Sequence, residues 1–143
     1  MEPYIALALQ TRCHAVNTCD VEGARRRMRE SIDRVHRQVI GAKTFVGPDL
    51  KLVVLPEYFL TGYPLDESIS AWSEKAALEP DGEEYQRLGA LCRDAGIHLS
   101  GNAYERDAHF PGLYFQTSFI LDDRGQCVLR YRRLISMFAP TPH

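Results

Sequence analysis

The stretch Lys51-Leu-Val-Val-Leu-Pro56, with Glu57 directly after it, decides the fold. Its four consecutive apolar residues lack the alternation of apolar and polar side chains that a half-exposed strand shows, so the pattern predicts a strand covered on both faces. Pro56 cannot donate a hydrogen bond to a neighbouring strand, and we expect the strand to end there. Helices that cross over a parallel sheet produce covered strands of this kind, which are typical of an α/β protein.

The residues before this strand predict another strand and a helix. Residues 4–10 form a short apolar run that indicates a first buried strand. A helix follows, because apolar residues recur at helical spacing, and Gly41 is its expected end. The apolar stripe consists of Ala24, Met28, Ile32, Val35 and Val39. Strand, helix and strand in succession make a βαβ unit.

The residues after it predict one more helix and three more strands. Residues 57–84 hold eight acidic residues and one lysine, which indicates mostly solvated surface. Pro80-Asp-Gly82 predicts the start of a helix that ends at Gly96. Its apolar stripe consists of Tyr85, Leu88, Leu91, Cys92 and Ala95. The expected strands are residues 97–104, 114–121 and 126–131, with a turn at residues 122–125 between the last two.

Composition excludes several classes of protein. A chain of 143 residues suits one domain, and a net charge of −2 does not favour nucleic acid or an anionic membrane as partner. No apolar run approaches the roughly 18 residues of a membrane span, and no secretory signal is visible. We therefore expect a cytoplasmic protein. The cysteines lack metal-ligand spacing, so we expect reduced thiols and no metal site. They are Cys13, Cys19, Cys92 and Cys127.

Two nucleic-acid or nucleotide interpretations carry less weight. The first predicted helix holds six arginines, which favour a solvated helix face with ion pairs along the helix over a nucleic-acid surface. They are Arg25, Arg26, Arg27, Arg29, Arg34 and Arg37. A nucleotide-binding βαβ module would need a glycine-rich phosphate loop, and neither G-x-G-x-x-G nor G-x-x-x-x-G-K-[ST] follows the first strand.

Glu57 is the first candidate catalytic residue. Functional groups of α/β sheets gather at the carboxyl ends of the strands, where Glu57 lies. Neighbouring Tyr58, Phe59 and Tyr63 would partly desolvate its carboxylate and make it a better proton acceptor, as a general base requires. Position alone favours a surface glutamate that begins a loop. The second element, Tyr131-Arg-Arg133 at the end of the last strand, is by itself only a basic strand end.

Together, these stretches resemble the nitrilase, or carbon-nitrogen hydrolase, superfamily. The segment from Leu52 to Pro64 is similar to its glutamate motif, and later segments follow in the family's order up to its lysine motif. They are Ala103-Tyr-Glu-Arg106, Tyr114-Phe-Gln-Thr-Ser-Phe119, the turn at residues 122–125 and Tyr131-Arg-Arg-Leu134. The resemblance covers about the first half of a usual family domain.

The resemblance implies an α/β fold, a nitrilase-like α-β-β-α sandwich, of which residues 1–143 would be a single partial domain, incomplete at the C-terminus. It implies hydrolysis of small amides or nitriles by a Cys-Glu-Lys triad, without metal or organic cofactor. The cysteine would form an acyl-enzyme, the glutamate would act as general base and acid, and the lysine would stabilise the tetrahedral intermediate. Glu57 matches the glutamate, and Tyr63 is the expected substrate-binding residue. Homo-oligomers are expected.

Two departures qualify this expectation. Arg133 occupies the lysine position, and Gln116 stands where many members carry asparagine. Arginine stays charged and can stabilise an oxyanion, but it does not readily give up a proton. The family's cysteine lies downstream of the lysine motif, and none of the four cysteines matches its context. The alternative is therefore a non-catalytic remnant or assembly partner with a nitrilase-like scaffold.

Overall fold

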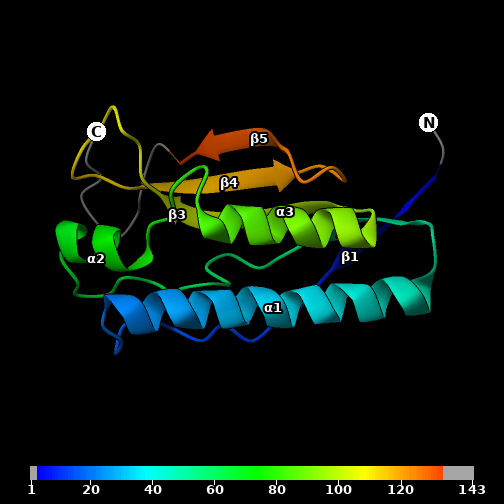
Figure 1. The fold of residues 1–143 in the computed structure, drawn as a ribbon, viewed down its shortest axis with the longest axis horizontal. Helices are drawn as coiled ribbons and strands as arrows, with labels where there is room; N and C mark the ends of the chain where they lie inside the picture. The colour runs from blue at the N-terminus through cyan, green and yellow to red at the C-terminus, as the bar shows by residue number, and fades with distance from the viewer. Residues whose placement is uncertain (1–2, 134–143) are drawn as a thin grey trace.

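The computed structural model describes residues 3–133, and they form one five-stranded sheet with three helices. The sheet order is β1-β2-β3-β4-β5, the same as the order in the chain. The strands are β1 (Ile5–Ala8), β2 (Leu50–Val54), β3 (His98–Glu105), β4 (Phe115–Leu121) and β5 (Cys127–Arg132). The helices are α1 (Val21–Val46), α2 (Ile69–Ala76) and α3 (Glu83–Ala95). Figure 1 shows α1 and α3 running along each other beside the sheet.

The direction of the strands decides where functional groups meet. β1 pairs with β2 in parallel and β2 pairs with β3 in parallel, so α1 is the crossover of the predicted βαβ unit. β3, β4 and β5 then pair antiparallel as a meander. The carboxyl ends of β2, β3 and β5 therefore lie at one edge of the sheet, together with the start of β4. Residues that follow β2 and β5 in the sequence are brought to this common edge.

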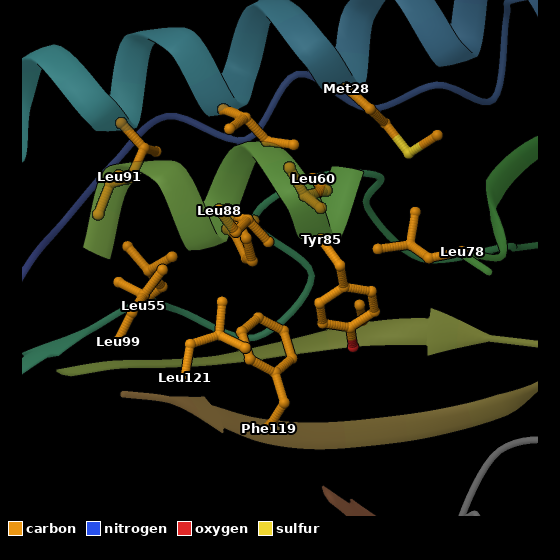
Figure 2. Close-up of a cluster of buried hydrophobic side chains, with 14 of the residues drawn as sticks. Met28, Leu55, Leu60, Leu78, Tyr85, Leu88, Leu91, Leu99, Phe119 and Leu121 are labelled. Atoms are coloured by element: carbon orange, nitrogen blue, oxygen red, sulfur yellow. The ribbon is translucent and has the colours of Figure 1, made fainter. Parts of the chain in front are cut away.

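The hydrophobic core lies between the helices and one face of the sheet. Figure 2 shows α1 and α3 on one side of this core and the strands on the other, with Leu88 of α3 and Phe119 of β4 pointing into the space between them. Both side chains are fully buried. Phe119 lies beneath Gly101 of β3, where a Cβ atom would come within 2.6 Å of the ring. The core therefore depends on a glycine in the middle of β3.

The predicted covering of β2 on both faces is wrong for the residues that the structure describes. Leu50 and Val53 are fully buried against the helices, whereas Val54 on the opposite face is 39% exposed. On that face β4 and β5 also carry half-exposed or exposed side chains, including Ile120 and Leu129. A continuous apolar run thus marks β2 as a strand, but within residues 3–133 the helices cover only one of its faces. We call the opposite face the open face of the sheet.

Helix α1 begins as predicted and ends later than predicted. The Asp20 carboxylate accepts a hydrogen bond from Gly23 N at 2.8 Å and caps the first turn. All five residues of the predicted apolar stripe are buried. The helix continues past Gly41 to Val46, because a glycine ends a helix only where it leaves the helical conformation. Gly47 does so, with φ of 99°.

Helix α2 lies inside the segment that was predicted to be solvated surface, so that prediction is wrong here. The Ser68 hydroxyl accepts a hydrogen bond from Ala71 N and caps the helix. Trp72 is fully buried and meets the ring of Tyr104 edge-on at 5.7 Å. The acidic composition of this segment predicted solvent exposure, but its single tryptophan packs the helix against β3. Helix α3, by contrast, begins after Gly82 and ends at Gly96 as predicted.

The arginines of α1 mostly contact other segments of the chain. Arg25 Nη2 donates to the carbonyls of Glu74 and Ala77 at 3.0 and 2.6 Å, and Arg27 Nη1 donates to Ala15 O at 2.7 Å. Burial lowers the pKa of Arg25, and the nearby Glu84 carboxylate opposes this effect. Arg25 and Arg27 therefore hold neighbouring segments against the helix and do not form the expected pairs along it. Within residues 3–133, no helix is both long enough and apolar enough to cross a membrane.

Candidate active site at the carboxyl end of β2

A tight turn after β2 positions Glu57. The backbone continues from β2 with Leu55 N donating to Ser100 O of β3 at 2.9 Å. Tyr58 then adopts a left-handed conformation with φ of 56°, and its carbonyl accepts hydrogen bonds from the amides of Thr61 and Gly62. A left-handed tyrosine is uncommon, and such residues concentrate at functional sites. The turn directs the Glu57 side chain towards Gln116 of β4.

The structure brings Glu57 and Arg133 together. Arg133 Nη1 lies 3.5 Å from Glu57 Oε1. Gln116 of β4 contacts both groups: its Nε2 donates to Glu57 Oε1, and its Oε1 accepts from Arg133 Nη1 at 2.9 Å. Arg133 N also donates to Gln116 O at 2.9 Å, which extends the pairing of β5 with β4 by one residue. A carboxylate, an amide and a guanidinium thus form a connected group.

The expectation that the Glu57 carboxylate is poorly hydrated is wrong for the described residues. Its side chain is 54% exposed, and that of Arg133 is 41% exposed. Both lie at the rim of the open face, where none of the three helices covers them. An ion pair this exposed contributes little to stability, typically about 0–1 kcal/mol.

Tyrosine rings surround the turn that carries Glu57. Tyr58 stacks on Tyr104 with ring centroids 5.5 Å apart and meets Tyr63 edge-on at 5.7 Å. Burial raises the pKa of Tyr58, the neighbouring Tyr104 hydroxyl opposes this rise, and the Glu57 carboxylate adds to it. Tyr58 is therefore a neutral hydrogen-bond donor at ordinary pH. Tyr63, the predicted substrate-binding residue, lies next to Tyr58, and its carbonyl accepts from Asn17 Nδ2 at 2.9 Å.

Two polar residues of the site were not predicted from the sequence as functional. Gln116 was noted only as a departure from a family motif, and Asn102 was not noted at all. Gln116 Nε2 donates to Asn102 Oδ1 at 3.3 Å, and Asn102 Nδ2 donates to Ser118 Oγ at 3.4 Å. The alternation of side chains along β3 and β4 puts all three residues on the open face. That alternation was the available signal, but it does not reveal which strands are neighbours.

The four cysteines are free, and the thiol pKa values of three of them are raised. Cys13 comes near the site, since its Sγ donates to Tyr58 O at 3.1 Å, but burial raises its thiol pKa. Burial also raises the thiol pKa of Cys127, and that of fully buried Cys92 to about 12. Reactive cysteines have lowered thiol pKa values. Within residues 3–133, no three His, Cys, Asp or Glu side chains are grouped so that they could hold a metal ion.

Asp107 fastens the end of β5 that leads to Arg133. Its carboxylate contacts Arg132 Nη2 at 2.5 Å and accepts from His109 N at 2.8 Å. The His109 amide, Arg132 and the His109 ring lower the Asp107 pKa to about 2. A lowered pKa means that the ionised form stabilises the fold above about pH 4 and that this contribution is lost as the pH falls through about 2.

We therefore expect Asp107→Asn to lose part of its stability near neutral pH and to show a weaker acid destabilisation than the unmodified protein. Thermal unfolding between about pH 6 and pH 2 measures this difference. The two curves should approach each other at the acid end, because about half of the unmodified carboxylate is protonated at pH 2. Curves that remain parallel down to the acid end would contradict the assignment of Asp107 to this acid-sensitive contact.

Similarity to known proteins identifies the family of the chain. A family model for carbon-nitrogen hydrolases matches residues 6–142. The chain is 30% identical over 104 residues to a protein of Pseudomonas protegens named hydrolase in pqqF 5'region. The matched region covers 72% of this chain and 33% of that protein. The chain is also 26% identical over 88 residues to a formamidase of Helicobacter acinonychis. This matched region covers 61% of this chain and 25% of that protein.

A solved structure shares the fold. The crystal structure of an amidase from Nesterenkonia sp. superposes with a TM-score of 0.66 and 18% identity, over 94% of this chain and 44% of that chain. The chain thus spans less than half the length of each of these three proteins. Its mixed α/β architecture with a five-stranded sheet agrees with the nitrilase-like fold expected from the sequence. From the match over nearly its whole length, the chain belongs to the carbon-nitrogen hydrolase family.

Proposed function

We propose that the protein that carries this chain hydrolyses a non-peptide carbon-nitrogen bond, in an amide rather than a nitrile, through a Cys-Glu-Lys type mechanism. Glu57 would be the general base, Arg133 would stand in for the lysine, and Tyr63 would contact the substrate. The observation that carries the proposal is the 3.5 Å approach of Arg133 Nη1 to Glu57 Oε1 at the carboxyl edge of the sheet. Named similarity to a formamidase supports an amide as substrate.

In the proposed reaction, Glu57 accepts the proton of a cysteine thiol, and the thiolate attacks the carbonyl carbon of the amide. Arg133 stabilises the negative oxygen of the tetrahedral intermediate by hydrogen bonding. Glu57 returns the proton to the leaving amine as the carbon-nitrogen bond breaks, which leaves a thioester. Glu57 then takes a proton from water as the water attacks the thioester. As the carbon-sulfur bond breaks, Glu57 returns this proton to the cysteine sulfur, so that the acid product leaves and the thiol is regenerated.

The nucleophilic cysteine is proposed to come from outside residues 3–133. In this part of the chain, the thiol pKa values of Cys13, Cys92 and Cys127 are all raised, which is the opposite of what a nucleophile needs. No metal or organic cofactor enters the proposed reaction. We place the protein in the cytoplasm as a homo-oligomer that acts on small molecules and not on nucleic acid or membranes.

A second candidate is a non-catalytic assembly partner, and the open face of the sheet favours it. Val54, Leu129 and Tyr131 on this face are 39%, 45% and 60% exposed, and exposed apolar surface of this kind promotes association. Arg133 in place of a lysine also points to lost chemistry. Light scattering that shows a stable monomer with an uncovered face would argue against this candidate.

Ammonia release from formamide, acetamide and a small nitrile tests the proposal. We expect turnover on an amide by the protein that carries this chain, and loss of turnover after alkylation with iodoacetamide. A variant with alanine at Cys13, Cys19, Cys92 and Cys127 should keep its turnover, because the nucleophile is expected elsewhere. No ammonia from any of the three substrates would favour the assembly partner, and turnover that survives full alkylation would exclude a cysteine nucleophile.

A further inference from the structure

Gln116 lies between the two charges of the candidate site. Its strand β4 pairs with β3 so that Gln116 is opposite Tyr104, and its side chain extends over the open face. Nε2 donates to Glu57 Oε1 and to Asn102 Oδ1, the latter at 3.3 Å, while Oε1 accepts from Arg133 Nη1 at 2.9 Å. One amide therefore connects the turn after β2 with β3 and with the end of β5.

The charges on either side determine the orientation of this amide. A carboxylate only accepts hydrogen bonds and a guanidinium only donates them. Glu57 must therefore face the NH₂ group of Gln116, and Arg133 must face its oxygen. Asn102 Oδ1 adds a second acceptor on the NH₂ side. If the amide were flipped, its oxygen would face the acceptor oxygens of Glu57 and Asn102, and its NH₂ group would face the donor NH₂ of Arg133. The three contacts therefore determine its orientation.

The distance between the charges shows what the amide does. Arg133 Nη1 and Glu57 Oε1 are 3.5 Å apart, whereas a charge-assisted hydrogen bond of this type measures about 2.7–2.9 Å. Arginine and glutamate in direct contact frequently form two parallel hydrogen bonds. Such a pair would occupy both carboxylate oxygens and hold them as an anion, which is unsuitable for a group that must take up and return a proton.

We propose that Gln116 is a positioning residue that holds Glu57 and Arg133 close together but keeps them from closing into a two-contact salt bridge. The neutral amide donates one hydrogen bond to the carboxylate and accepts one from the guanidinium. The carboxylate then remains able to exchange a proton. The meaning of this role rests on the proposed function, because only a proton-transferring Glu57 needs such a spacer. The geometry itself, however, can be tested without any turnover.

The test compares crystal structures and NMR spectra of the 143-residue chain with those of Gln116→Met, which keeps the side-chain length and removes the hydrogen bonds. In the variant we expect the Arg133–Glu57 distance to shorten from 3.5 Å to about 2.8 Å. We also expect two separate Nη resonances for Arg133, since a two-contact pair blocks rotation of the guanidinium. Exposed Arg124 gives the reference for free rotation.

Matched variants make the result decisive. Ile120→Val, four residues along the same face of β4 and outside this hydrogen-bonded group, should leave both the distance and the Arg133 resonances unchanged. Adding Glu57→Gln to Gln116→Met should abolish the separate resonances, because the partner charge is gone. If Gln116→Met does not fold, Gln116→Asn tests the same point, since its amide is one methylene shorter and should contact only one of the two charges.

An unchanged distance together with averaged Arg133 resonances in the position-116 variants would overturn the spacer role. So would an Arg133 that moves away from Glu57, because the amide would then only anchor the arginine. Neither outcome bears on whether the protein hydrolyses amides, which ammonia release decides separately. A failure of this inference is therefore distinguishable from a failure of the proposed function.

Discussion

Replacing Glu57 by glutamine is expected to lower the rate of amide hydrolysis by about 10²–10⁴-fold, the usual contribution of a general acid-base group. Glutamine has nearly the same shape as glutamate but cannot accept the thiol proton. Because Glu57 is half exposed and its ion pair with Arg133 is weak, the fold should tolerate the change. The loss should therefore appear in kcat, with far-UV circular dichroism and melting temperature close to those of the unmodified protein.

Asp66→Asn is the matched control for this prediction. Asp66 is exposed and lies on the same loop, so the control makes the same change from carboxylate to amide nine residues away. It should leave ammonia release unchanged, which separates the role of Glu57 from a general effect of lost charge. Full turnover by Glu57→Gln would exclude Glu57 as the base, whatever the identity of the nucleophile.

The sequence predicted those parts of the fold that depend on local periodicity. The apolar run before Pro56 corresponds to β2, and the stripe from Ala24 to Val39 is buried along α1. Helix α2 was not predicted because Trp72 is its one large buried side chain. One such residue among charged neighbours does not produce a recognisable apolar stripe at helical spacing. The end of α1 was misplaced because the spacing of apolar residues does not reveal which of two glycines adopts a left-handed conformation.

The candidate site was predictable only in part, for a related reason. Residues directly after a strand can be assigned to the edge of a sheet, and this placed Glu57 correctly. The neighbour of a strand within the sheet is decided by long-range pairing, so nothing near Gln116 in the sequence indicates that it faces Glu57. Hydration is likewise set by distant segments that pack over a group, which is why the exposure of Glu57 differed from expectation.

Glu105 at the end of β3 should matter most for stability. Its side chain is completely buried, and it accepts hydrogen bonds from the Tyr85 hydroxyl of α3 and from Arg130 Nε of β5, the latter at 3.1 Å. Burial raises the pKa of Tyr85, and the Glu105 carboxylate raises it further, so the hydroxyl stays a donor. The Arg130 guanidinium also lies over the Tyr85 ring, 5.5 Å from its centroid. A single carboxylate thus joins β3, α3 and β5.

We expect Glu105→Ala to lower the free energy of unfolding by about 3–5 kcal/mol, as measured by urea denaturation. The reason is that the Tyr85 hydroxyl and the partly buried Arg130 both lose their partner, and a buried group without a partner is costly. Glu79→Ala is the control, since Glu79 pairs with Arg106 at 3.2 Å but is 58% exposed. That change should cost less than about 1 kcal/mol.

A charge-free pair of substitutions separates the loss of the ion pair from the cost of the charge that is left behind. If the unpaired guanidinium causes most of the destabilisation, then Glu105→Leu combined with Arg130→Met should be more stable than Glu105→Leu alone. Because Arg130 lies in β5 and Arg133 directly follows that strand, loss of Glu105 should also loosen Arg133, which NMR of its guanidinium would detect. If Glu105→Ala is as stable as Glu79→Ala, this account is contradicted. The position of β5 would then depend on its pairing with β4 alone.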